Sequence, residues 1–286
     1  MKHLISGSIL LSLLVWMLLP FSSLHQKTQP PLHFPTYPPS VILQMMSLGT
    51  QELTATLIFY NAQFYFGEKY AWRQEAPEYQ RLFAALDKAT DLDPYNMDCY
   101  YFAQGLFSDI KPAIPLLNRL LEKGMRHRKQ DWYLPFFISA NYYFQLNDPI
   151  KAAEYLQHAA ALNPDNAIFA SLSARMLYQG NQTVTAITYL EGFINETKNP
   201  AVRKKLLLRL HTLRAIHLLE NAIVAYTKDK GKPPDMLDDL ISAGFLNKIP
   251  ADPYGGTFLL DETGRVHTTS KMTDTWNKHD HSNQDQ

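Results

Sequence analysis

The sequence has 286 residues, of which 27 are acidic and 27 are basic, so the formal net charge is zero. Its 46% of hydrophobic and 19% of charged residues exclude a disordered chain, and the balanced charge gives no reason to expect a nucleic-acid partner. The length allows a sizeable core without disulfides or metals. The single cysteine, Cys99, excludes both an intrachain disulfide and a cysteine-based zinc site.

The first segment, residues 4–24, contains no charged side chain. At about 1.5 Å per residue, a helix of this length crosses a hydrocarbon core of about 30 Å. The residues that follow show no small-x-small cleavage pattern. We therefore expect residues 1–25 to form an uncleaved signal anchor and transmembrane helix, with the body of the protein outside the cytoplasm. A cleaved signal peptide and an exported chain are the alternative.

Residues 26–41 are rich in proline, with five prolines between Gln29 and Ser40. Because proline fixes φ and favours an extended, semi-rigid conformation, this segment is expected to be a linker that holds the folded body away from the bilayer. A ligand for a proline-binding domain is the other interpretation.

Residues 42–200 show the apolar spacing of helices, with short polar segments between them. The pattern also repeats every 34 residues, which predicts a stack of helix pairs. Asn147-Asp148-Pro149 is expected as the turn within one pair. The first set of repeated positions is Ala140, Tyr143, Ala152, Leu156 and Ala159, and the second is Ala174, Leu177, Ala186, Leu190 and Phe193.

Two segments carry the second-helix signature of a known repeat family. They read Ala152-x3-Leu156-x2-Ala159-x4-Pro164 and Leu82-x3-Leu86-x2-Ala89-x4-Pro94. The pattern resembles the tetratricopeptide repeat (TPR) family. The resemblance implies an all-α, right-handed solenoid of about four helix pairs. It places a degenerate unit between the two segments, an insertion at residues 72–79, and the end of the last second helix at Pro200. The degenerate unit has Tyr100, Ala103 and Phe107 on its first helix and Ala113, Leu117 and Leu121 on its second.

The resemblance to TPR proteins also implies a concave surface that binds proteins or peptides, lined by the first helix of each pair. This chain has many aromatic residues on those helices. Five aromatic residues within nine positions, 136–144, cannot all lie on one side of a helix, so some are core residues and a few lie at a repeat junction or are exposed in the groove. The candidates for groove binding are Tyr100, Tyr101, Phe107, Phe136, Phe137, Tyr142 and Tyr143.

The solenoid is expected to end in a capping helix over residues 201–228, followed by a different kind of sequence at 229–270. The latter contains Ile249-Pro250-x-Asp252-Pro253-Tyr254-Gly255 and a predicted hairpin with its turn at residues 261–264. It resembles the C-terminal module of type II secretion major pseudopilins, which is a small α+β unit. Residues 1–24 lack the acidic residue of a processed pilin subunit. Residues 271–286 are expected to be a disordered tail.

Pseudopilin modules bind calcium, so the resemblance makes Asp252 and Asp261 candidate ligands. Two acidic residues near a turn more often accept hydrogen bonds from backbone amides, and a calcium site needs six to eight oxygens. We therefore favour the structural role for both residues and expect no metal or other cofactor.

The sequence contains no phosphate-binding glycine loop, no Gly-x-Ser-x-Gly motif and no His-Glu-x-x-His motif. We therefore expect a non-enzymatic scaffold or adaptor in a bacterial envelope assembly or a secretion or pilus-type system. Its partners would be proteins or peptides, and it would be anchored in the inner membrane with its body in the periplasm. An exported module that binds a peptide or another ligand is the alternative. A cell-wall hydrolase would need paired carboxylates in a cleft, and no spacing identifies such a pair.

Overall fold

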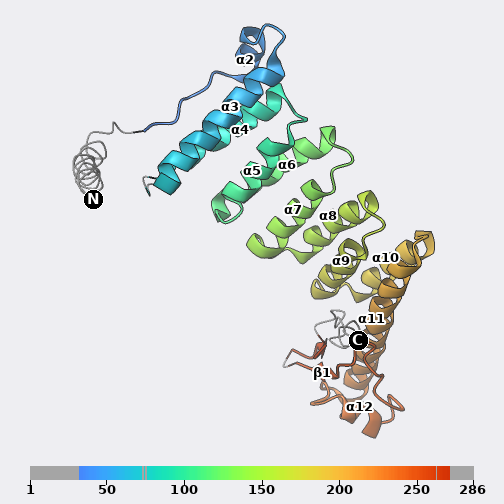
Figure 1. Ribbon diagram of the computed structural model, residues 1–286. Helices are drawn as coiled ribbons and strands as arrows, with labels where there is room; N and C mark the ends of the chain where they lie inside the picture. The colour runs from blue at the N-terminus through green and yellow to red at the C-terminus, as the bar shows by residue number, and fades with distance from the viewer. Residues whose placement is uncertain (1–31, 73, 75, 262, 271–286) are drawn as a thin grey trace, which may run out of the picture. The chain divides into compact units, whose positions relative to one another are not determined.

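The computed structural model describes residues 32–270, except 73, 75 and 262 (Figure 1). The expected anchor at residues 4–24, the first part of the linker and the tail at 271–286 lie outside the described residues. In the part of the chain that is described, none of the helices combines the length and the apolarity that a membrane span requires. The described chain is mostly helical. It divides into two compact units between Cys99 and Tyr100.

The described part of the first unit is built from α2 (Ser40–Met46), α3 (Gln51–Phe66) and α4 (Tyr79–Leu92). A π-helical turn, η1 (Gly67–Trp72), extends α3, and the loop before α4 lies where the sequence predicts an insertion. Helices α3 and α4 pack against each other through small and branched side chains, since residues such as Ala55, Ala62 and Ala89 are completely buried.

The proline-rich residues 32–39 form an extended segment held by α3, η1 and α4. The ring of Phe34 is completely buried and lies 4.9 Å from the ring of Tyr65. The side chains of Lys69, Arg81 and Lys88 donate hydrogen bonds to the backbone carbonyls of residues 32, 34 and 37. Residues 32–39 therefore pack on the folded body and do not form part of a free spacer between the body and the bilayer. Burial of the Phe34 ring and hydrogen bonds from basic side chains to the backbone outweigh the tendency of the prolines to keep this segment extended in solvent.

The second unit begins within α5 (Met97–Phe107), which the unit boundary crosses. The next helices pack in sequence order as pairs, in agreement with the repeat. These elements are η2 (Lys111–Ala113), α6 (Ile114–His127), α7 (Tyr133–Ala140), the π-helical turn η3 (Asn141–Gln145), α8 (Pro149–Leu162), α9 (Ala167–Gln179) and α10 (Thr183–Glu196).

The 34-residue period extends to the turns between helices. Asn147 and Asn181, one repeat apart, both have a left-handed backbone (φ 52° and 60°), which asparagine tolerates better than most residues. Asp165 and Asn199 are also one repeat apart, and the amide of Asn199 donates a hydrogen bond of 3.2 Å to the carboxylate of Asp165. The repeat therefore specifies the loops as well as the cores of the helices.

The long helix α11 (Pro200–Lys230) follows, and its apolar face from Leu206 to Ile223 is buried. Pro200 begins this helix, whereas we expected it to end the preceding helix. The side chain of Asn199 caps α11 by accepting a hydrogen bond of 3.0 Å from the backbone N–H of Ala201. Gly231, with φ 73°, ends α11.

The last elements are α12 (Asp238–Ser242) and an antiparallel hairpin of β1 (Phe258–Leu260) and β2 (Val266–Thr268). The strands pair across the predicted turn, with Leu260 opposite Val266. The carboxylate of Asp239 stabilises the start of this short helix by accepting hydrogen bonds from the backbone N–H groups of Asp235 and Met236. The guanidinium of Arg265 donates to backbone carbonyls at the end of α9 and lies over the ring of Tyr178, which fixes the hairpin on the helices.

Candidate functional site

A cluster of six aromatic side chains joins three successive first helices of the second unit. Tyr101 comes from α5, Phe169 comes from α9, and the remaining four lie on α7 or immediately before it. The ring of Tyr101 lies 5.3 Å from Phe137 and 5.5 Å from Tyr133, measured between ring centroids. We call this group the aromatic cluster: Tyr101, Trp132, Tyr133, Phe136, Phe137 and Phe169.

The contacts continue from α7 to α9. Trp132 stacks on Tyr133 with ring centroids 3.6 Å apart, and it also lies 5.0 Å from Phe169. Phe136 lies 5.6 Å from Phe169. Tyr101, Trp132, Phe136 and Phe137 are partly buried and Tyr133 keeps 41% of its surface exposed, whereas Phe169 is a core residue with 4% exposed. The members from α5 and α7 therefore present a partly exposed apolar surface, which Phe169 of α9 supports from the core. Exposed apolar patches are common at binding sites.

Asp131 organises the polar edge of the aromatic cluster. Its carboxylate accepts hydrogen bonds from the hydroxyl of Tyr101 (3.2 Å), the Nε of Arg128 (2.9 Å) and the backbone N–H of Tyr133 (3.1 Å). Burial and the negative charge of Asp131 both raise the pKa of Tyr101. Tyr101 is therefore a neutral hydrogen-bond donor at physiological pH, and Arg128 neutralises the carboxylate.

A group of amides, of which Asn118 and Asn141 are buried and Gln104 is partly buried, links the helices that carry the cluster. The side chains of Gln104 and Asn141 exchange two hydrogen bonds, of 3.0 and 3.1 Å. Asn141 also donates to the Oδ1 of Asn118 at 2.8 Å. These bonds join α5, α6 and the π-helical turn η3. Because buried amides tolerate little movement once they are paired, the network holds the first helices in one register.

The seven groove candidates from the sequence fall into three groups. Tyr101, Phe136 and Phe137 belong to the aromatic cluster. Tyr100 and Phe107 are completely buried and are core residues, so a role for them in ligand contact does not agree with the structure. The spacing of Tyr100, Ala103 and Phe107 puts them on one face of α5, and Gly124 makes room there for the ring of Tyr100.

Tyr142 and Tyr143, the other two candidates, lie outside the aromatic cluster. The ring of Tyr142 stacks on Tyr155 at 5.6 Å, and the ammonium of Lys151 lies 5.2 Å from its centre. Tyr143 contacts the ring of Phe144 edge-on. Tyr142 and Tyr143 are both partly buried and pack against the core of the second unit.

Three members of the aromatic cluster were missed by the sequence analysis: Trp132, Tyr133 and Phe169. Trp132 and Tyr133 lie at the start of a helix whose beginning the sequence did not define. Phe169 is nearly one repeat after Phe136, so the period could have identified it.

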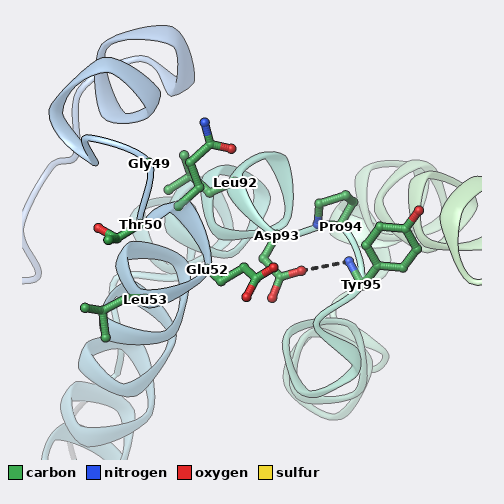
Figure 2. Close-up of a pocket in the computed structure, with 9 residues that line it drawn as sticks. Gly49, Thr50, Glu52, Leu53, Leu92, Asp93, Pro94 and Tyr95 are labelled. Atoms are coloured by element: carbon green, nitrogen blue, oxygen red, sulfur yellow. Dashed lines mark hydrogen bonds between the residues drawn. The ribbon is translucent and has the colours of Figure 1, made fainter.

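The first unit contains an open hollow of about 570 Å³ between the α2–α3 and α4–α5 turns, lined by residues 49–53 and 92–95. Figure 2 shows the side chains of Glu52 and Asp93 pointing toward one another across it. The carboxylate of Asp93 accepts a hydrogen bond of 3.0 Å from the backbone N–H of Tyr95, so it has a role in the turn.

Asp252 and Asp261 both act as acceptors within the C-terminal hairpin. Asp252 is buried and accepts from the hydroxyls of Thr268 and Ser270. Asp261 accepts from the backbone N–H groups of Thr263 and Arg265, both at 2.9 Å. Within residues 32–270, as far as they are described, no three His, Cys, Asp or Glu side chains gather as a metal site would require. The hydrogen bonds of Asp252 and Asp261 give both carboxylates a role in stabilising the turns of this module.

Comparisons with known proteins show a partial similarity to solved structures. Neither a family model nor a curated protein matches the sequence. Among solved structures, the chain is similar to MamA, residues 41 to the end, from Desulfovibrio magneticus RS-1. The match has 17% sequence identity and a TM-score of 0.34, and it covers 55% of this chain and 92% of that one.

Proposed function

We propose that the protein is a membrane-anchored scaffold of the TPR type, whose aromatic cluster binds an extended segment of a partner protein. The observation that carries this proposal is the partly exposed aromatic surface that α5 and α7 form together, supported from the core by Phe169 of α9. Aromatic residues are enriched at the energetic centres of protein interfaces, because they bury a large area at low entropic cost.

The repeat geometry favours an extended ligand. Packed helices lie about 8–10 Å apart, and an extended chain rises about 3.3 Å per residue. One helix step therefore corresponds to about three residues of ligand. The first unit provides an example within this chain, since residues 32–39 lie extended on α3 and α4 with one buried ring and bonded carbonyls.

The charge around the aromatic cluster indicates the class of ligand. Asp131 is paired with Arg128, so the cluster does not present a net charge at its polar edge. A ligand with aromatic or aliphatic side chains and free backbone carbonyls fits this surface better than a strongly acidic or basic peptide does.

Membrane anchoring is supported by the uncharged residues 4–24. The resemblance of residues 229–270 to pseudopilin modules supports a place in a secretion or pilus-type assembly of a bacterial envelope. In that setting the anchor lies in the inner membrane and the body lies in the periplasm. The role is non-enzymatic and requires no cofactor.

The proposal is tested by purifying the tagged protein from crosslinked native membranes and quantifying the proteins that accompany it. The test variant is Tyr133→Ala with Phe137→Ala. The matched control is Val184→Ala, an exposed apolar residue on the second helix α10. We expect partners to fall at least about tenfold in the test variant and to be unchanged in the control, because hot-spot aromatic residues each contribute about 2 kcal/mol or more. Equal recovery from a test variant that keeps its helical circular dichroism would contradict the proposal.

A further inference from the structure

The segment from Ser40 to Phe66, which contains α2 and α3 (Figure 1), has one charged residue, Glu52, in 27 positions. It also exposes an unusual amount of apolar surface. Of the 22 large apolar side chains that are exposed in the described chain, nine belong to this segment. They are Val41, Ile42, Met45, Met46, Leu48, Leu53, Leu57, Tyr60 and Phe64. A surface of this kind in a soluble domain marks an interaction site.

Helix α3 is apolar on two faces. One face, which includes Ile58, Phe59 and Ala62, is buried within the first unit. The other face is an exposed row with steps of four, three and four residues, formed by Leu53, Leu57, Tyr60 and Phe64. Helices that are hydrophobic all round are normally covered on all sides, so the exposed row requires a covering that the described chain does not supply.

The turn between α2 and α3 adds an independent observation. Leu48 has a left-handed backbone, with φ 46°, and 90% of its surface is exposed. This conformation is strained for a branched, bulky residue. Within the described part of the chain, the Leu48 side chain is not buried, so no apolar contact offsets the backbone strain. A binding partner that buries this side chain would explain why a leucine occupies the turn.

We propose that the apolar surface of α2 and α3 docks on the lipid bilayer, with the α2 side chains and Leu48 entering the acyl boundary. This inference rests on the proposed anchor at residues 4–24. From Leu24 to Leu32 the chain has eight residue steps, which span at most about 29 Å even when fully extended. Phe34 is fixed in the core of the first unit, so this unit stays at the membrane surface.

The chemistry of the segment favours lipid over a charged partner. No lysine or arginine occurs between Lys27 and Lys69. Docking therefore depends on apolar insertion, as in interfacial helices, and it does not depend on attraction to anionic headgroups. Covering of the same surface by a second copy of the chain is the other outcome that the experiment must separate.

The experiment uses the full chain in phosphatidylcholine vesicles, with a fluorescent label on Met45→Cys in a Cys99→Ala background. The matched control carries the label on Gln80→Cys, which is exposed on α4. We expect lipids brominated in their acyl chains to quench the label at position 45 at least about threefold more strongly than the label at position 80. Quenching should be unchanged by salt or by added anionic lipid.

Three results would overturn the inference. A vesicle-bound chain whose label at position 45 remains in water contradicts lipid docking and leaves the anchor intact. Energy transfer between labels at position 45 on different copies, without quenching by lipid, assigns the surface to a second copy. A full chain that is released from vesicles by alkaline carbonate contradicts the proposed anchor and this inference together.

Discussion

Asp252 fixes the C-terminal hairpin through several hydrogen bonds to one buried carboxylate. Burial by itself raises the pKa of this group. The hydrogen bonds from Ser270, Thr268 and the backbone N–H of Tyr254 lower it by more, so the pKa lies below its usual value. The charged form is therefore the one that the folded hairpin favours.

The sign of the pH dependence follows from this lowered pKa. The contribution of Asp252 is fully present above the unfolded-state pKa of about 3.9 and is lost as the pH falls toward the folded-state value. We expect Asp252→Asn to lower the free energy of unfolding by about 2 kcal/mol at neutral pH. Stability of the variant should also fall less steeply below about pH 4.

Thermal unfolding followed by circular dichroism between neutral and acidic pH measures both effects. Asp235→Asn is the matched control, because Asp235 belongs to the same module and its side chain is 81% exposed. If Asp252→Asn loses stability with the same acid dependence as the wild type, the assigned role of the carboxylate is wrong.

At the scale of elements, the packing of residues 32–39 on the first unit was not predicted from the sequence. Phe34→Ala removes a completely buried ring and is expected to lower the free energy of unfolding of the first unit by about 3–5 kcal/mol. The segment should then become accessible to proteases. Thr36→Ala, at an exposed position of the same segment, should leave the digestion pattern unchanged. Limited proteolysis with mass mapping of the cut sites decides between the two outcomes, and equal protection in Phe34→Ala would contradict the docking.

The helices and the hairpin were predictable because their signals are local. The 34-residue period defines α8, α9 and α10, and glycine and proline mark the end of α11. The docking of Phe34 depends on a tertiary contact across more than 40 residues, which no local pattern encodes. The capping role of Asp239 was not predicted, because four acidic residues at positions 229–239 could each cap α12. Which of them accepts the backbone N–H groups depends on the conformation of the backbone before the helix.

At the scale of the molecule, the position of the candidate site was predictable, but its full membership was not. The resemblance to TPR proteins identified the first helices, and Tyr101, Phe136 and Phe137 lie in the aromatic cluster. Tyr100 and Tyr101 are adjacent aromatic residues with opposite roles, because a difference of one residue rotates the side chain by about 100° around the helix. Helical spacing alone therefore cannot say which of the two tyrosines faces the core; that requires knowing which helices pack on α5.

The central claim is that the aromatic cluster is the surface that contacts a partner. Its most direct test places a photo-crosslinking amino acid at Tyr133, and in a parallel variant at Val184, and irradiates cells that express the full chain. The account predicts a discrete crosslinked protein from position 133, attached through one continuous short segment, and none from position 184. The same adducts from both positions, or an adduct from position 184 alone, would contradict the claim.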